Sequence, residues 1–212
     1  MDSDGGNAGP RVFTIGHSSH SLDTFLDLLR RQQITCVVDV RSSPHSAYAP
    51  HFNKSGVERS LIAQGIRYVF LGDKMGGKPE GQAFYDDEGH VLYYRLAQSE
   101  RFQQGINDVM REVQAYRVAL LCGEEDPTEC HRRVLIGRVL GERGLNVFHL
   151  RGDGGVQREE EVAKDEDLSK TKGQGRLFDM EEAEEWKSAQ SVLPRKEQRN
   201  SSVFSGEPGS NV

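Results

Sequence analysis

The chain has 212 residues, of which 35% are hydrophobic, and its formal net charge at pH 7 is −6. This acidic balance argues against general nucleic-acid binding through overall charge, although an acidic tail can hide a basic cleft. No apolar stretch is long enough to span a bilayer, no signal peptide is recognisable, and three cysteines do not make a disulfide framework. We therefore expect a cytoplasmic protein with no membrane partner.

Five short apolar runs alternate with helical patterns between residues 11 and 153. The expected strands are 11–15, 34–40, 66–71, 118–121 and 147–150, and the expected helices follow Ser21, cover 57–64 and 102–115, and follow Asp126. This alternation predicts an α/β fold, namely a single three-layer domain with a mainly parallel sheet of about five strands. Residues 1–10 are expected to be flexible and residues 154–212 to form a polar, mostly disordered C-terminal tail.

One stretch after the fourth expected strand gathers the side chains best suited to chemistry. Asp126 and Pro127 are typical of a helix start, and a helix N-terminus favours anions and lowers thiol pKa values. In open α/β sheets ligands bind beyond the carboxyl ends of the strands, where this stretch lies. The candidate catalytic residues in it are Cys122, Glu124, Cys130 and His131.

Polar residues also follow the other expected strands and should reach the same edge of a parallel sheet. His17 could act as a general acid, and Asp39 could act as an acid, a base or a nucleophile. The alternatives are a structural histidine, a fixed ion pair of an arginine with Asp39 or Glu124, and aromatic rings that belong to the core. Phosphate or substrate contacts are expected from Arg41, Ser42, Gly76, Gly77, Lys78 and Arg132, and stacking on a base from Tyr48 and Phe52.

The cysteines permit more than one interpretation. Cys122 at the end of an apolar strand could be a simple buried hydrophobic residue, whereas Cys130 beside His131 and Arg132 could be a nucleophile, a redox partner or a metal ligand. Zinc could bind through Cys122, Cys130, His131 and a remote histidine, but four ligands at a recognised spacing are absent. No metal and no other cofactor is therefore predicted.

An ordered set of short motifs across the expected domain resembles the domain of unknown function family 488. The resemblance implies a small cytosolic α/β protein whose site is marked by a cysteine and a downstream Cys-His-Arg, and it implies no established reaction. The motifs are Thr14-Ile15-Gly16-His17-Ser18, Asp39-Val40-Arg41-Ser42-Ser43-Pro44, Gly65-Ile66-Arg67-Tyr68, Gly76-Gly77-Lys78-Pro79, Leu121-Cys122-Gly123-Glu124 and Cys130-His131-Arg132.

The tail contains a second short pattern, Gln174-Gly175-Arg176-Leu177-Phe178. It is similar to the Gln-x-x-Leu-Phe peptide by which bacterial replication and repair proteins hold the sliding clamp. Two apolar anchors in a polar, mobile segment suit a peptide that docks into a pocket. The resemblance implies partner binding through Gln174, Leu177 and Phe178, and the alternative is that the two apolar residues pack a turn onto the domain.

The clamp-like peptide and the anion-suited edge of the sheet both favour a DNA-associated repair-type enzyme that processes a damaged or modified base or nucleotide. The favoured reaction is cleavage of an N-glycosidic bond, which needs a carboxylate, a proton donor for the leaving base and cationic contacts to phosphate. One alternative is a cysteine-dependent sulfur-transfer or redox protein that uses Cys122 and Cys130. Another is a non-catalytic DNA-binding adaptor.

Overall fold

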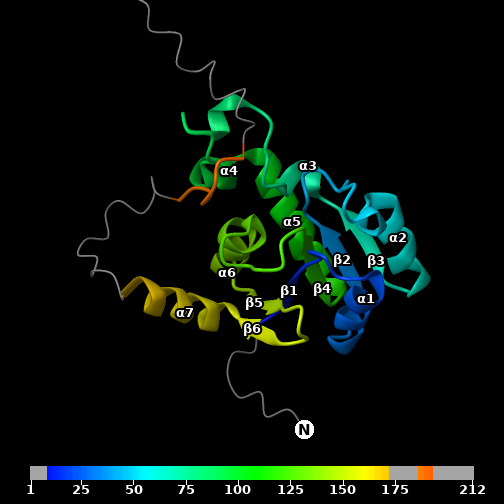
Figure 1. Ribbon diagram of the computed structural model, residues 1–212. Coiled ribbons are helices and arrows are strands. Elements are labelled where there is room, and N and C mark those ends of the chain that lie inside the picture. The colour runs from blue at the N-terminus through cyan, green and yellow to red at the C-terminus, as the bar shows by residue number, and fades with distance from the viewer. Residues whose placement is uncertain (1–8, 172–185, 193–212) are drawn as a thin grey trace, which may run out of the picture.

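The computed structural model describes residues 9–171 and 186–192 and centres on a six-stranded sheet (Figure 1). The strand order is β3-β2-β4-β1-β5-β6; the first five strands along the order pair in parallel, and β6 is antiparallel to β5. The strands are β1 (Arg11–Gly16), β2 (Cys36–Asp39), β3 (Arg67–Phe70), β4 (Val118–Cys122), β5 (Asn146–Leu150) and β6 (Val156–Arg158). The predicted α/β class and mainly parallel sheet are confirmed.

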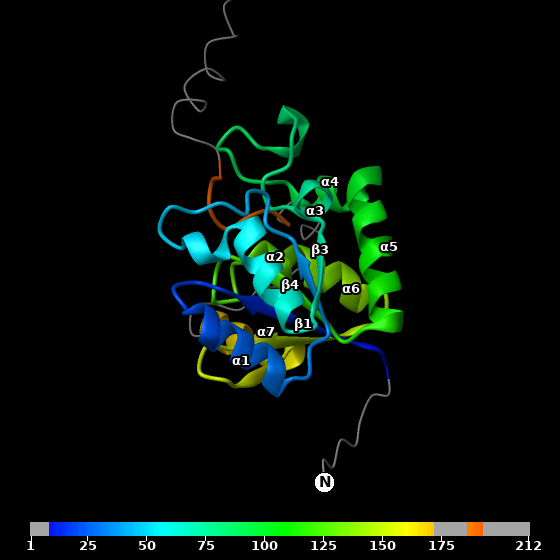
Figure 2. The ribbon, with the colours of Figure 1, turned by 90° about the vertical axis from the view of Figure 1, so that its right-hand side faces the viewer.

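Helices cover both faces of the sheet and make three layers (Figures 1 and 2). The central strand β4 is buried on both faces, because Val118 and Leu120 pack in one apolar cluster and Ala119 and Leu121 in the other. Helices α1 (Leu22–Arg31) and α2 (Lys54–Ala63) cover the second face, and α4 (Tyr93–Gln98), α5 (Glu100–Ala115) and α6 (Arg138–Glu142) cover the first. The short connecting helices are η1 (Pro50–Phe52), α3 (Gly72–Met75) and η2 (Gln82–Phe84).

The topology places a crevice at the end of β4. This strand lies between β1 and β2, whose connections lead to α1 and α2 on one face of the sheet, whereas β4 leads to α6 on the other face. When the loops after neighbouring strands lead to opposite faces of the sheet, a space opens between them. Ligands bind in this space in open α/β sheets. The sequence order of the elements therefore directs attention to Cys122, the last residue of β4.

The helix that follows β4 begins later than its sequence indicates. Asp126 does not cap a helix; its Oδ1 accepts hydrogen bonds from the backbone N and the hydroxyl of Thr128, at 2.9 and 2.8 Å. This local turn competes with helix initiation, as short acidic side chains often do. A π-helical turn, η3 (Arg132–Gly137), then continues into α6. Cys130 accordingly lies before the helical segment and not within its first turn.

The ordered domain extends beyond the predicted boundary at Asp153. Strand β6 adds a hairpin to β5, and α7 (Glu159–Thr171) follows it. The helix was not predicted, because its many charged residues resemble a solvated tail. Two of them instead pair with Arg133, which is 6% exposed: Glu159 at 2.9 Å and Glu166 at 2.8 Å. The predicted clamp-binding residues Gln174, Leu177 and Phe178 lie outside the described residues. No helix in the described ranges is both long and apolar enough to cross a membrane.

Candidate functional site

A cavity of about 900 Å³ opens beyond the carboxyl ends of the parallel strands. Its walls come from the loops that follow β1, β2, β3 and β4, and from the C-terminal segment 188–192. The predicted site residues that line it are His17, Arg41, Ser42, Gly77, Lys78, Cys122, Glu124, Cys130 and His131. The fold thus brings together most of the side chains that were expected to meet at this edge of the sheet.

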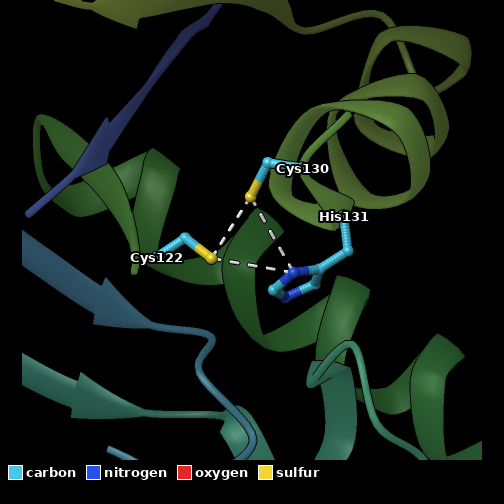
Figure 3. Close-up of side chains that lie close together, drawn as sticks. All are labelled: Cys122, Cys130 and His131. Atoms are coloured by element: carbon cyan, nitrogen blue, oxygen red, sulfur yellow. Dashed lines mark hydrogen bonds between the residues drawn. The ribbon is translucent and has the colours of Figure 1, made fainter. Parts of the chain in front are cut away.

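Three of these side chains converge on one point (Figure 3). The Sγ atoms of Cys122 and Cys130 are 3.3 Å apart, and Nδ1 of His131 lies 3.7 Å from the first sulfur and 4.0 Å from the second. Cys122 ends β4, whereas Cys130 and His131 immediately precede η3. Both cysteines are buried free thiols, so the end of one strand and the start of one helical segment form a compact thiol–imidazole cluster.

The orientation of the His131 ring is set by the backbone. Its Nε2 lies 3.1 Å from the carbonyl oxygen of Val40, and because a carbonyl only accepts, Nε2 carries the hydrogen. Nδ1 is therefore the atom that exchanges protons with the sulfurs. Gly77 makes room for the ring, since a Cβ at that position would lie 2.9 Å from Cγ of His131. Gly77 also lines the cavity, and the phosphate contact expected of it stays a prediction.

The three groups shift one another's pKa values in a consistent sense. A hydrogen bond from Cys130, assisted by His131 and opposed by burial, holds the pKa of Cys122 well below that of an ordinary thiol. The same hydrogen bond, together with burial, raises the pKa of Cys130. Burial is the largest single cause and lowers the pKa of His131, but the charge and hydrogen bond of Cys122, the bond to the Val40 carbonyl and the charge of Glu124 together outweigh it and leave the pKa raised. The favoured state is a Cys122 thiolate beside an imidazolium, with the second proton kept on Cys130.

Asp39 is not among the residues that line the cavity. Its carboxylate is fully buried and accepts from Nε and Nη2 of Arg41, at 2.9 and 2.6 Å, and from the hydroxyl of Tyr68 at 2.8 Å. Arg41 also donates to the carbonyl of Phe52. The arginine lines the cavity, yet its charge is already balanced, so the ion pair that sequence analysis held as the alternative is the one observed. This arrangement favours a structural role for Asp39.

Arg132 is also structural in its contacts. Its side chain is fully buried, donates from Nε to Thr14 at 3.2 Å, and donates from Nη1 and Nη2 to the backbone carbonyls of Glu124 and Glu125. The guanidinium therefore shapes the loop after β4 from beneath and does not line the cavity. The guanidinium donates to one hydroxyl and two carbonyl oxygens and makes none of these bonds to a carboxylate.

The remaining predicted residues differ in their access to the cavity. His17 lines it, stacks on the ring of Phe52 at a centroid distance of 4.4 Å and holds a Ser18 carbonyl through Nδ1, while burial lowers its pKa. Phe52 is a core residue at 1% exposure, and Tyr48 is fully exposed outside the lining. Gly76 packs against Ser42, whose Oγ accepts from the backbone N of Lys78 at 2.9 Å.

The C-terminal segment 186–192 forms a wall that was not predicted from the sequence. Trp186 donates from Nε1 to the carbonyl of Val134 at 2.8 Å, stacks edge-on against Tyr93 and lies beneath the guanidinium of Arg138. Ser188 is buried; its backbone N donates to the carbonyl of Val91, and its Oγ accepts from the backbone N of Val91. Residues 188–192 then reach the cavity. The signal in the sequence was a lone tryptophan in an otherwise polar region, which is typical of an anchor.

Replacing Trp186 with alanine is expected to loosen this wall without unfolding the sheet. The variant loses the ring contacts and the bond to Val134, so exchange of the Ser188 amide hydrogen should accelerate by about tenfold or more. Hydrogen exchange followed by mass spectrometry measures this, with Tyr48→Ala as an exposed aromatic control. Equal acceleration within β4 would contradict the expectation, because it would mean that the segment and the sheet open together.

The cluster can also be considered as a metal site. The ligand atoms of Cys122, Cys130 and His131 lie within 4.8 Å of one another, and thiolate and imidazole are ligands that Zn²⁺ accepts. Three protein ligands would leave a fourth position for a group from the cavity. The same spacing suits a thiol pair that reacts directly, so metal content is a measurement that separates the two possibilities.

One known protein family matches this chain. The family model described as domain of unknown function DUF488 matches residues 21–139, which is more than half of the chain. The chain belongs to this family. The part that matches DUF488 contains β2 to β4 and the whole thiol–imidazole cluster, whereas segment 186–192 lies outside it. No curated protein and no solved structure matches the chain.

Proposed function

We propose that this DUF488 protein is a thiol–disulfide oxidoreductase in which Cys122 attacks a disulfide substrate and Cys130 completes the reaction. The observation that carries the proposal is the 3.3 Å separation of the two sulfurs beside an imidazole, in a cavity that admits a ligand. A nucleophile with its base in reach, and a third group that orients the base, is the general arrangement of covalent catalysis. The backbone carbonyl of Val40 is that third group.

In the first step the Cys122 thiolate attacks one sulfur of the substrate disulfide. A bond forms between Cys122 Sγ and that sulfur, the substrate S–S bond breaks, and the leaving thiolate takes the proton from Nδ1 of His131. Attack by a thiolate through a mixed disulfide is how such exchange proceeds. His131 is left neutral, with Nε2 still donating to Val40.

In the second step Cys130 resolves the mixed disulfide. The hydrogen bond to the Cys122 thiolate, which is the largest cause of the raised Cys130 pKa, no longer exists once Cys122 is in a covalent bond. Neutral His131 takes the Cys130 proton across the 4.0 Å separation, and Cys130 Sγ attacks Cys122 Sγ. The sulfurs need to approach by about 1 Å to reach disulfide bonding distance. The bond between Cys122 Sγ and the substrate sulfur breaks, the second half of the substrate leaves as a thiolate and takes the proton from His131, and a reducing dithiol then regenerates the protein.

The geometry supports this function better than base excision. An N-glycosidase needs a carboxylate at the substrate, and Asp39 is committed to Arg41 and Tyr68, which leaves Glu124 as the candidate from the sequence. Cleavage of an N-glycosidic bond therefore stays a prediction that depends on Glu124. DNA association stays a prediction as well, because the clamp-like peptide lies outside the described residues.

The test is oxidation of the reduced full-length protein with excess 2-hydroxyethyl disulfide, a small neutral substrate. Of the three free thiols two should disappear, the mass should fall by that of two hydrogens, and peptide mapping should find Cys122 joined to Cys130. Cys36 should stay a thiol, because burial raises its pKa to about 12. The Cys36→Ala variant is the matched control and should form the same disulfide.

Two results would contradict the proposal. In the first, the protein is purified with one zinc ion per chain, and Cys122 stays unreactive until a chelator removes the zinc. This result would make the cluster a metal site. The other is a metal-free protein in which Cys122 and Cys130 both persist as thiols under conditions that oxidise a free small thiol completely. Metal analysis by mass spectrometry accompanies the thiol count for this reason.

A further inference from the structure

Two side chains of opposite charge face the cavity. Lys78 and Glu124 both line it and are exposed, and neither side chain has a hydrogen bond or ion pair within the described part of the chain. The hydrogen bonds of these two residues are made by their backbone atoms. The amide of Lys78 donates to Ser42 Oγ at 2.9 Å, and the carbonyl of Glu124 accepts from Arg132. The two loops are thus held through their backbones. The charge of Glu124 contributes to the raised pKa of His131, but both charged side chains stay exposed to a ligand in the cavity.

The two charges come from different loops. Lys78 belongs to the connection after β3, which shares its side of the cavity with Ser42 and His45 from the connection after β2. Glu124 follows β4 directly, and the other carboxylates that line the cavity, Asp126 and Glu129, belong to the same loop. Because β4 lies beside β2 and β2 beside β3, the cavity has a cationic side and an anionic side.

The thiol that reacts lies in this divided cavity. Cys122 ends β4, two residues before Glu124, and His131 packs over Gly77, the residue before Lys78. A ligand whose sulfur reaches Cys122 therefore brings its substituents toward both charges. A neutral disulfide would satisfy neither of them, and a ligand with a single sign of charge would satisfy one and be repelled by the other.

We propose that the substrate is a small disulfide of the amino-acid type, which carries a carboxylate and an ammonium group close to each sulfur. The proposal rests on the thiol–disulfide function above. The carboxylate pairs with Lys78 and the ammonium group with Glu124. A cavity of about 900 Å³ is of the size that encloses small ligands, and segment 188–192 closes one side of it, which favours a small molecule over the disulfide of a folded protein.

Four symmetrical disulfides test the proposal with the full-length protein. Cystine carries both charges, cystamine only ammonium groups, 3,3′-dithiodipropionate only carboxylates, and 2-hydroxyethyl disulfide neither. The rate of thiol release is divided by the rate of the same disulfide with a free small thiol, which removes intrinsic reactivity. Each matched charge should accelerate the reaction by about twofold to fivefold at low ionic strength, so cystine should exceed the neutral compound by about fourfold to twenty-fivefold.

Two variants separate the two charges. Lys78→Met should abolish the preference of cystine over cystamine, and Glu124→Gln should abolish the preference of cystine over 3,3′-dithiodipropionate. Lys164→Met and Glu160→Gln are the matched controls, since they make the same charge changes on α7, outside the cavity lining. Both controls should keep the order of the four disulfides.

The outcomes distinguish this inference from the function on which it rests. Equal corrected rates for cystine and 2-hydroxyethyl disulfide would overturn the amino-acid assignment and leave the oxidoreductase intact. The fastest reaction with 3,3′-dithiodipropionate or with cystamine would overturn it too, in favour of a substrate with one sign of charge. Failure of all four compounds to oxidise Cys122 would overturn the proposed function itself.

Discussion

Replacing Cys130 with serine is expected to trap Cys122 as a stable mixed disulfide with the substrate. Serine keeps the size and a hydrogen-bonding group but cannot attack sulfur, so release of the second substrate thiol should depend on thiols in solution. A neighbouring nucleophile at 3.3 Å has an effective concentration far above that of a dissolved thiol, and release should slow by at least about 100-fold. Intact-protein mass spectrometry would show the adduct.

Cys122→Ser is the companion variant and should lose the reaction altogether. Cys130 does not replace the missing nucleophile, because burial still raises its pKa in the absence of Cys122. Cys36→Ala should behave like the unmodified protein. The opposite assignment, in which Cys122→Ser accumulates the adduct and Cys130→Ser does not react, would show that the order of attack has been reversed.

Asp39→Asn is expected to destabilise the fold by about 3–5 kcal/mol, because it leaves the Arg41 guanidinium buried without its counter-charge. The amide also loses acceptor capacity for the hydroxyl of Tyr68. Denaturant unfolding followed by circular dichroism measures the change in the free energy of unfolding. The result bears on function, because a catalytic carboxylate would cost activity and leave stability nearly unchanged.

The matched control is Asp73→Asn, which removes an exposed ion pair with Arg101 at 3.7 Å. A pair of this kind contributes at most about 1 kcal/mol, so the control should unfold almost as the parent does. Similar small losses for both variants, with activity abolished only in Asp39→Asn, would reverse the structural assignment of Asp39. The comparison thus separates a buried ion pair from a chemical role at a single position.

Much of the fold was predictable from local pattern. Continuous apolar runs such as Val118 to Leu121 are typical of strands buried on both faces, and Ser21 was identifiable as the N-cap of α1, where its side chain accepts from Thr24 N. The order of these elements then predicts parallel pairing. Strand β6 and helix α7 were not predictable in this way, because their charged residues resemble a solvated tail until Arg133 is seen to bind Glu159 and Glu166.

The site was predictable in its members but not in their roles. Loops after parallel strands meet at one edge of a sheet, and this rule placed His17, Lys78, Cys122 and Glu124 around one cavity. It does not say which side chains turn inward. Asp39 and Arg132 occupy positions as favourable in sequence as those of the cavity residues, yet both are committed to buried contacts.

The sequence by itself therefore determined the class of fold and the edge of the sheet at which chemistry is placed, because these depend on the periodicity and order of residues along the chain. The family followed from the ordered motifs and from the match over residues 21–139. Only the tertiary structure decided that Cys122, Cys130 and His131 touch, that Asp39 is closed off, and that Trp186 anchors a wall of the cavity. Some of these contacts join residues distant in sequence, as Trp186 and Val134 do, and others join near neighbours such as Asp39 and Arg41, but in each case side-chain packing selects the partner. Periodicity carries no information about that selection.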